Sequence, residues 1–262
     1  MKTYVFANQK GGVGKSFLVV QFAYYLRLLR GLRVLVIDFD HQRNSTKSIK
    51  TGGFAVVSTL TADQLLRESA SSIERAEFVL VSGTQELIKM ERKEDQHNVY
   101  VNNLYQFLNS VSDQFDVCLI DTNPNPDIRQ LSALVCSQFV VSPIQLNQEA
   151  IDGIGDLLNH ESIGIRRIQE TINPNLQLIG ILPNIVEPTP FQRDNFQSLA
   201  KHYAKLLIPL EHGFAAIKRT TAIPESQAAG IPVWKLGKTS GREAWAQIKP
   251  VFEKIAEPLE IS

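Results

Sequence analysis

A glycine-rich stretch near the N-terminus constrains this chain more than any other feature. Residues 8–16 read NQKGGVGKS; they follow an apolar run at 4–7, which predicts a buried strand, and precede an apolar run at 17–29, which predicts a helix. Glycines let backbone N–H groups approach an anion, and the positive end of the helix dipole lies at the same place. The stretch therefore predicts a phosphate-binding turn between a strand and a helix.

This turn matches the triphosphate-binding P-loop pattern with one departure, because Gln9 stands where the pattern has glycine. Lys15 is expected to reach the terminal phosphates, and the Ser16 hydroxyl to ligate Mg²⁺. Gly-Gly pairs beside lysines also occur in ordinary hairpins, but here the strand, the Gly-Lys-Ser end and the helix follow in the required order. The residues expected to contact the nucleotide in this turn are Lys10, Gly11, Gly12, Val13, Gly14, Lys15, Ser16 and Phe17.

An additional lysine, Lys10, precedes the glycines. With it, the segment KGGVGKS resembles the deviant Walker A loop of the ParA/MinD family of P-loop ATPases. The resemblance implies that ATP and Mg²⁺ are the cofactors, and that Lys10 crosses to the partner's phosphates in a nucleotide-sandwich homodimer. Chemistry alone places only a second cation beside the phosphate cradle. Phe17 stands where the family usually has Thr, so one hydroxyl near the phosphates is missing.

Acidic residues follow two further strand-like runs. Residues 33–38 end in Asp38, with Asp40 two positions later, and residues 116–121 end in Asp121. Ligands of parallel sheets gather at the carboxyl ends of strands, so these acids are expected to face the phosphates, although such an acid also serves as a simple helix cap. Asp121 fits the Mg²⁺ water shell of a P-loop site. The resemblance adds Asp38 to that shell and assigns Asp40 to orienting the attacking water.

The segments after these acids depart from the family. His41 and Arg43 stand where the family usually has Pro and Gly, and Asn123 stands where it usually has Pro. The backbone shape of the Asp40 loop, and with it the rate of hydrolysis, is therefore not predicted by the resemblance.

Composition bounds the fold class. The 262 residues, of which 44% are hydrophobic, are enough for one large α/β domain. Continuous apolar strands in strand–loop–helix–strand order predict parallel βαβ units. We therefore expect a single domain, residues 1–262, with the P-loop NTPase fold: a mostly parallel, twisted sheet with helices on both faces.

Charge and cysteine content exclude several classes. The chain has 27 basic and 27 acidic residues, which argues against a protein coated in basic charge. The two cysteines, Cys118 and Cys136, lack metal-ligand spacing and fit a reducing cytoplasm. We expect no additional segment before the first strand and no signal peptide, and no apolar run is long enough to span a bilayer.

Further predictions concern elements farther along the chain. Residues 58–67 have helical spacing, residues 191–207 read as an amphipathic helix, and residues 207–209 resemble the family's last core strand. In the family, an Asn after an earlier strand and the loop after the last core strand hold adenine. These roles fall on Asn184 and Pro209, although a buried Asn often simply ties a loop.

Basic residues accumulate in the C-terminal third. Each one alone is most simply a solubilising charge, but together they are expected to contact phosphates without sequence preference. Members of the family that segregate DNA bind it as ATP-bound dimers through such a face. The residues assigned to this face are Arg193, Lys201, Lys205, Lys218, Arg219 and Lys235.

These features together predict a ParA-type DNA-partition ATPase, cytoplasmic and associated with the nucleoid. Lys10, Lys15 and Asp40 would act in catalysis, and Ser16, Asp38 and Asp121 would order the metal. The ATP-bound homodimer would bind DNA non-specifically and release it when a ParB-type adaptor stimulates hydrolysis.

Three alternatives compete with this prediction. A MinD-like membrane ATPase would need a basic amphipathic tail, which the ending EPLEIS does not supply. An iron–sulfur reductase that shares the loop would need cluster-ligating cysteines, and the two cysteines present do not fit. A scaffold that binds nucleotide without turnover is harder to separate from an ATPase by sequence.

Overall fold

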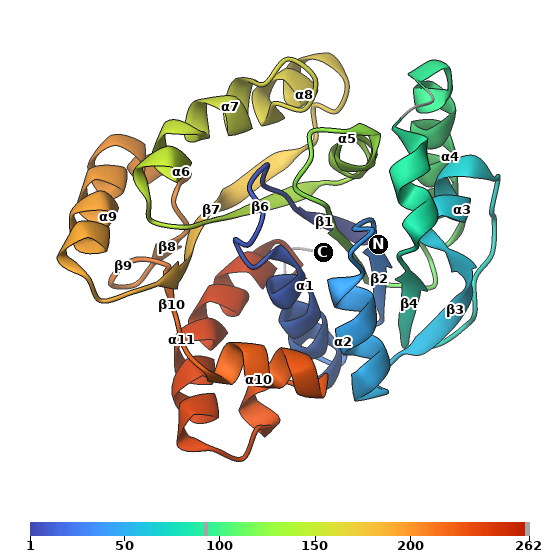
Figure 1. The fold of residues 1–262 in the computed structure, drawn as a ribbon. Helices are drawn as coiled ribbons and strands as arrows, with labels where there is room; N and C mark the ends of the chain where they lie inside the picture. The colour runs from blue at the N-terminus through green and yellow to red at the C-terminus, as the bar shows by residue number, and fades with distance from the viewer. Residues whose placement is uncertain (92–93, 260–262) are drawn as a thin grey trace.

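The computed structural model, which describes residues 1–91 and 94–259, shows an eight-stranded sheet with helices on both faces (Figure 1). The strand order is β10-β7-β6-β1-β5-β2-β4-β3, and all pairings within it are parallel in the described residues. The strands of this sheet are β1 (Lys2–Phe6), β2 (Val34–Asp38), β3 (Val56–Thr61), β4 (Phe78–Ser82), β5 (Val117–Asp121), β6 (Phe139–Ile144), β7 (Gln177–Val186) and β10 (Ile217–Lys218). The predicted α/β class and parallel sheet are confirmed.

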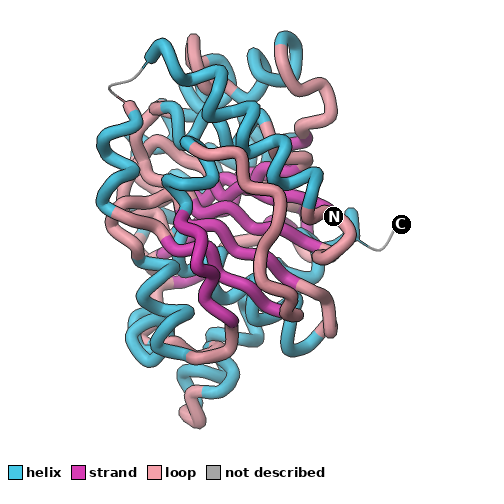
Figure 2. Tube along the Cα trace, turned by 90° about the vertical axis from the view of Figure 1, so that its right-hand side faces the viewer, coloured by secondary structure: helices cyan, strands magenta, loops and turns pink. Residues whose placement is uncertain are grey.

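Helices connect the strands and form layers on either side of them (Figure 2). The α-helices are α1 (Lys15–Tyr24), α2 (Asn44–Gly52), α3 (Ala62–Arg67), α4 (His97–Ser110), α5 (Ile128–Val135), α6 (Gln148–Asp152), α7 (Ile154–Asn159), α8 (Ile165–Thr171), α9 (Pro190–Tyr203), α10 (Ala222–Ala229) and α11 (Thr239–Ala256). The shorter helical turns are η1 (Tyr25–Leu29), η2 (Gln85–Met90), η3 (Glu94–Gln96), η4 (Ala204–Leu206), η5 (Val233–Lys235) and η6 (Glu257–Leu259). Within the described residues, no helix is both long and apolar enough to cross a membrane.

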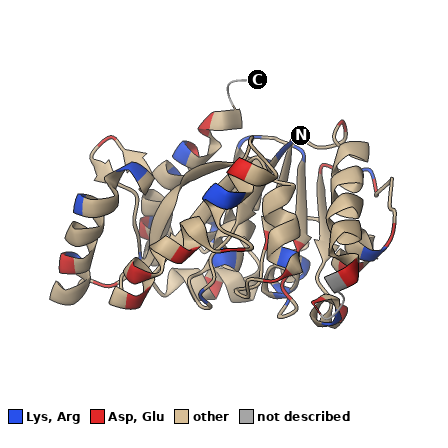
Figure 3. Ribbon diagram, turned by 90° about the horizontal axis from the view of Figure 1, so that it is seen from above, with Lys and Arg blue, Asp and Glu red and all other residues tan. Residues whose placement is uncertain are grey.

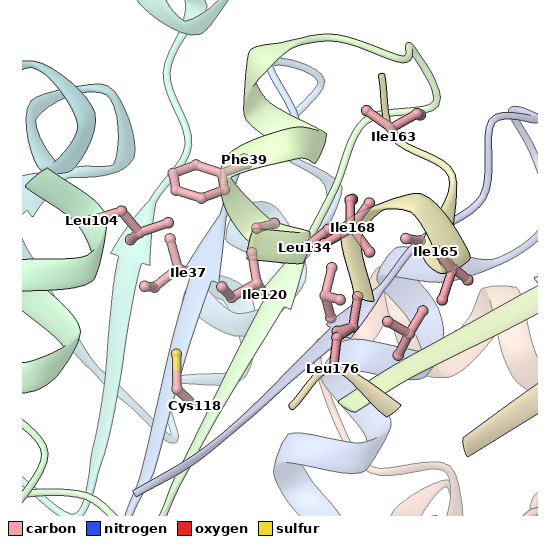
Figure 4. Close-up of a cluster of buried hydrophobic side chains, with 14 of the residues drawn as sticks. Ile37, Phe39, Leu104, Cys118, Ile120, Leu134, Ile163, Ile165, Ile168 and Leu176 are labelled. Atoms are coloured by element: carbon pink, nitrogen blue, oxygen red, sulfur yellow. The ribbon is translucent and has the colours of Figure 1, made fainter. Parts of the chain in front are cut away.

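Successive side chains of the central strands enter two different hydrophobic cores. On β2, Leu35 and Ile37 face the core shared with α3 to α8, whereas Val34 and Val36 face the core shared with α1 and α11. Figure 4 shows part of the first core, where Leu104 of α4 lies near Ile37. Because strands point alternate side chains to opposite faces, a strand buried on both faces reads as a continuous apolar run.

The three central strands end side by side. Phe6 at the end of β1 is in register with Asp121 at the end of β5, and Asp121 is in register with Asp38 at the end of β2. The glycine-rich turn leaves β1 at the same level and enters α1. The sheet therefore brings the loop and two of the predicted acids to one edge.

The helix predicted at 58–67 is wrong in its first half. Residues 56–61 form β3, which pairs with β4, and the helix α3 begins only after Thr61. Thr61 and Gln64 form a reciprocal capping box that fixes this start. Short runs of β-branched residues fit both helix and strand periods, so pairing with β4 decided the outcome.

The ends of two other predicted helices differ from expectation. The helix expected at 17–29 is α-helical to Tyr24, and its last turn, Tyr25–Leu29, is wound as a π-helix. The helix expected at 191–207 is α9, which ends at Tyr203 and continues as the short turn η4.

The last core strand predicted at 207–209 is also wrong. Leu207 makes one isolated bridge to Ile181, after which the chain leaves the sheet in a small antiparallel hairpin of β8 (Pro209–Leu210) and β9 (Gly213–Phe214). The carbonyl of Ile208 accepts a hydrogen bond from the N–H of Ala215, which follows the hairpin. This carbonyl is therefore bonded to the hairpin segment and not to a neighbouring strand of the sheet. The edge strand is instead β10. The prediction that the chain has no membrane anchor used the ending EPLEIS, and residues 260–262 of this ending lie outside the described residues.

Candidate nucleotide-binding site

The glycine-rich turn lines an open cavity of about 390 Å³ at the carboxyl edge of the sheet. Besides residues 11–17 of the turn itself, four other parts of the chain contribute. Its lining comprises Gly11, Gly12, Val13, Gly14, Lys15, Ser16, Phe17, Asp40, Gln42, Asn44, Pro124, Asn184, Ile185, Ile223 and Gln227. The structure thus brings most of the predicted nucleotide-binding residues to one cavity.

Two glycines give the turn its shape. Gly12 has φ +73° and Gly14 has φ +89°, a left-handed backbone that residues with a side chain adopt only at a cost. Gly14 is the N-cap of α1, so the free N–H groups of the first helical turn open into the cavity beside it. A Cβ atom on Gly14 would lie 2.3 Å from Nδ2 of Asn184. This close approach requires glycine at position 14.

Side chains from outside the glycine run hold the loop backbone in place. Oδ1 of Asn8 accepts the N–H of Lys10 at 2.8 Å, and Nε2 of Gln145 donates to the Gly12 carbonyl at 3.2 Å. Sequence reasoning missed both tethers. Gln145 comes from the end of β6, 133 positions away, and no short motif marks such a partner.

Asn184 reaches the loop from β7. Its Nδ2 donates to the Val13 carbonyl at 2.8 Å, while its Oδ1 is buried and has no hydrogen-bond partner within the described residues. Asn184 therefore ties the loop and also lines the cavity, where its predicted contact with adenine stays a proposal. Pro209 lies elsewhere: it lines a separate cavity with Lys2 and Gln177, at the edge of the sheet where strands begin. The structure does not bring Pro209 to this site.

The two lysines of the loop have different surroundings. Lys15 is buried, and its Nζ donates to the carbonyls of Asn8 (3.0 Å) and Lys10 (3.1 Å). Burial lowers the pKa of Lys15, and the nearby carboxylates of Asp121 and Asp40 act in the opposite direction. The side chain of Lys10 is 36% exposed, and its Nζ lies 3.5 Å from a carboxylate oxygen of Glu149 on α6. Lys10 does not line the larger cavity; it lines a smaller one of about 70 Å³.

Asp38 is fully buried at the end of β2. One of its oxygens accepts both the N–H (2.9 Å) and the hydroxyl (2.6 Å) of Thr46, and the other accepts the N–H of Asp40 (3.0 Å). Burial raises the pKa of Asp38 to about 7, and the neighbouring Asp121 carboxylate adds to the increase.

Asp121 is the second fully buried acid. Its Oδ2 accepts the Ser45 hydroxyl at 2.6 Å, and a hydrogen bond from the Ser16 side chain further favours its charged form. Burial nevertheless raises the pKa of Asp121 to about 6. Its Oδ1 is buried without a hydrogen-bond partner among the described residues. Two adjacent buried carboxyl groups, one with an unpartnered oxygen, need a cation or protons to be stable together.

This donor set fits Mg²⁺. The ion prefers hard oxygen ligands and keeps several waters, so one or two carboxylates suffice when phosphate oxygens complete the shell. Ser16 lines the cavity, and the carboxylates of Asp38 and Asp121 lie buried side by side at the ends of β2 and β5. No group of three or more His, Cys, Asp or Glu gathers as a metal cluster in the part of the chain that the structure describes.

Asp40 is buried in a tight loop and lines the cavity. Its Oδ1 accepts the N–H of Gln42 at 2.9 Å, and its carbonyl accepts the N–H of Arg43 at 2.9 Å. Arg43 adopts φ +61°, so an arginine takes the left-handed conformation at the position where the resembling family usually has glycine. Arg43 in place of glycine therefore does not open the loop.

The predicted DNA-binding residues fall into two places. Arg193, Lys201 and Lys205 lie exposed on or just after α9, and Figure 1 shows α9 near β10, which carries Lys218. Lys235 is apart from them: its Nζ lies 5.0 Å from the centre of the Phe54 ring, beyond α2.

Charge pairing further divides the set. Arg219 forms an ion pair with Glu187 at 2.5 Å, so its charge is partly balanced. Figure 3 shows basic and acidic positions interspersed in a view of the molecule from above. Sequence reasoning could count the cations but could not show which of them have acidic neighbours.

Comparison with known proteins adds independent evidence. The family model described as an AAA domain matches residues 1–178. Protein IncC of Escherichia coli is 32% identical over 276 aligned residues, which cover all of this chain and 71% of IncC. The chromosome-partitioning ATPase Soj of Treponema pallidum is 28% identical, over 88% of each chain.

Solved structures agree with the fold. Apo McdA of Cyanothece superposes with a TM-score of 0.78, covering 97% of this chain and 99% of McdA, at 18% identity. At that identity the likeness shows the fold alone. Cobyrinic acid a,c-diamide synthase of Mycobacterium smegmatis superposes with a TM-score of 0.67 at 26% identity, over 93% of this chain and 92% of that chain, and its structure holds an ATP analogue and magnesium.

Proposed function

Because this chain belongs to the ParA/MinD family of P-loop ATPases, whose cofactors are ATP and Mg²⁺, we propose that it is a DNA-partition ATPase. In this proposal the ATP-bound form is a homodimer with nucleotide between the subunits. The dimer binds DNA without sequence preference, and a ParB-type adaptor stimulates hydrolysis and release. The cargo is a DNA molecule such as a plasmid or a chromosome.

The cavity residues divide the work of phosphoryl transfer. The N–H groups of residues 12–16 and the ammonium of Lys15, once it leaves the loop carbonyls that it now contacts, hold the phosphates. Ser16, Asp38 and Asp121 would hold Mg²⁺, which supplies positive charge at the phosphate oxygens. Asp40, which also lines the cavity, orients the attacking water. Positioning and charge stabilisation account for most of the rate in this type of reaction.

The placement of Lys10 supports the dimer most directly. Lys10 directly precedes the glycines that line the phosphate cavity, and its ammonium lies 3.5 Å from a carboxylate oxygen of Glu149, whose side chain is 87% exposed. An exposed ion pair of this kind contributes about 0–1 kcal/mol, so a phosphate of a second subunit competes with it easily. Lys10 is thus available to reach outward, whereas Lys15 is buried within its own loop.

The cations after β7 support the DNA-binding part of the proposal. Arg193, Lys201 and Lys205 give α9 and the turn that follows it an exposed positive charge that no buried role explains. We assign the DNA face to these three residues together with Lys218. Lys235, which packs over Phe54, and Arg219, which pairs with Glu187, are left out of it.

A DNA-retention assay tests the proposal. Wild type and Asp40→Ala are passed over immobilised DNA with ADP, ATP or a slowly hydrolysed ATP analogue, and hydrolysis is measured in parallel. We expect retention only with ATP or the analogue, and longer retention of Asp40→Ala with ATP. Lys15→Ala is the control, because it is expected to lose nucleotide binding and be retained in no state.

Two results would contradict the proposal in different ways. Equal retention in every nucleotide state would remove the switch. Nucleotide binding with no hydrolysis above background, with or without DNA, would favour a nucleotide-binding scaffold.

A further inference from the structure

A buried ion pair lies behind the Asp40 loop, at the start of α5. Asp127 is the N-cap of α5, and Arg129 is 3% exposed; Nε of Arg129 lies 3.1 and 3.0 Å from the two carboxylate oxygens of Asp127, and its Nη2 also contacts that carboxylate. Asn123 donates to the same carboxylate at 2.8 Å. A buried pair of this kind gives little net stability, because both charges lose their hydration. We therefore looked for the role of the Asp127–Arg129 pair in its contacts with other residues.

The remaining arm of the guanidinium contacts His41. Nη1 of Arg129 lies 3.1 Å from Nδ1 of His41. A guanidinium can only donate hydrogen bonds, so Nδ1 must accept, and the ring proton lies on Nε2. Nε2 of His41 lies 3.1 Å from Nε2 of Gln42, so the Gln42 amide must turn over to present its oxygen to this proton. The backbone carbonyl of His41 in turn accepts from Nε2 of Gln85 at 3.2 Å.

His41 directly follows Asp40, so its anchors also fix the loop that carries the carboxylate. The turn is strained at Arg43, whose left-handed backbone costs about 1–2 kcal/mol and persists only where surrounding contacts enforce it. We propose that Arg129 is a positioning residue for hydrolysis: by donating to Nδ1 of His41 it holds the 40–43 turn so that Asp40 faces the phosphate cavity. Arg129 acts through His41, because it does not line the cavity itself. This inference rests on the proposed role of Asp40 in orienting water.

A matched pair of substitutions at His41 tests the contact. In His41→Asn, the amide oxygen is bonded to Cγ, as Nδ1 is in histidine, so an acceptor stays within reach of Arg129. In His41→Gln, the polar atoms lie one bond farther out, at the level of Nε2, and the acceptor at Nδ1 is lost. A third variant, Asp127→Asn/Arg129→Gln, removes the guanidinium without leaving a buried charge unpaired and keeps a good N-cap.

Single-turnover ATP hydrolysis and affinity for the Mg²⁺ complex of AMPPNP are measured for each variant, with thermal unfolding as a check on folding. We expect His41→Gln and Asp127→Asn/Arg129→Gln to hydrolyse ATP about tenfold more slowly than wild type, with AMPPNP affinity within about twofold. His41→Asn is expected to keep most of the wild-type rate.

Three outcomes would overturn the inference. Wild-type rates in His41→Gln and the double variant would show that the contact does not position Asp40. Equal losses in His41→Asn and His41→Gln, or parallel losses of AMPPNP affinity and rate, would show a merely structural role. If the wild type hydrolysed ATP no faster than Asp40→Ala, the proposed role of Asp40 itself would be wrong. This outcome is distinct from the others, because it compares only the wild type with Asp40→Ala and involves no variant of His41 or Arg129.

Discussion

Gly14 is the position in the candidate site where one added methyl group should cost most. Its φ of +89° costs a residue with a side chain about 1–2 kcal/mol. The new Cβ would also lie 2.3 Å from Nδ2 of Asn184, which must then leave the Val13 carbonyl. Leaving buried polar groups unpaired costs about 1–3 kcal/mol. We therefore expect Gly14→Ala to lower the free energy of unfolding by roughly 2–5 kcal/mol.

Urea denaturation of the nucleotide-free protein measures this loss, and the melting temperature should fall by roughly 5–20 °C. Gly12→Ala is the matched control, because Gly12 also has a positive φ, +73°, but an added Cβ there meets nothing within 4 Å. Gly12→Ala should cost only about 1–2 kcal/mol. Gly155→Ala, in open space on α7, should instead stabilise the protein by about 0.5–1 kcal/mol.

The double variant Gly14→Ala/Asn184→Ala separates the backbone cost from the overlap. Removing the Asn184 amide also removes the atom that the new methyl group meets, so the double variant should lose less stability than the two single variants summed. A Gly14→Ala protein as stable as Gly12→Ala would refute the reasoning, because the close approach to Asn184 would then carry no energy.

Two further predictions concern charge. Asp38 and Asp121, with pKa values raised by burial to about 7 and about 6, bind protons more tightly in the folded chain than in the unfolded one. The nucleotide-free protein should therefore lose roughly 6 kcal/mol of stability as pH rises from 4 to 8, and Asp121→Asn should reduce this slope in urea denaturation. In salt titrations of DNA binding, the removal of three phosphate contacts should reduce the slope of log K against log salt by about 2.7, and an unchanged slope would exclude α9. The residues to be replaced by Ala are Arg193, Lys201 and Lys205, and the matched control replaces the exposed residues Arg166, Arg167 and Lys249.

The parts of the site that the sequence predicted are those encoded over short distances. The strand, the glycine turn and the Lys15–Ser16 end of the loop are contiguous, so the phosphate cavity follows from local pattern alone. Asp38 and Asp121 could be placed together because continuous apolar strands imply a parallel sheet, and parallel strands end at one edge.

The parts that could not be predicted depend on distant partners. Gln145 reaches Gly12 across 133 positions, and Arg129 reaches His41 across 88, with no motif to mark either contact. The predicted contact of Pro209 with adenine depended on a core strand at 207–209. The structure has only a single bridge at Leu207, and at Ile208 the chain leaves the sheet. Short apolar segments are ambiguous in this way, because tertiary pairing decides between a core strand and a bridge.

Sedimentation velocity of the Asp40→Ala protein tests the central claim most directly, since this variant should hold ATP without turning it over. With Mg²⁺ and ATP the protein should sediment as a dimer, and with ADP as a monomer. Adding Lys10→Ala should weaken the dimer while leaving ATP binding by Lys15 and the glycine turn in place. A single sedimenting species, unchanged between ATP and ADP, would contradict the account.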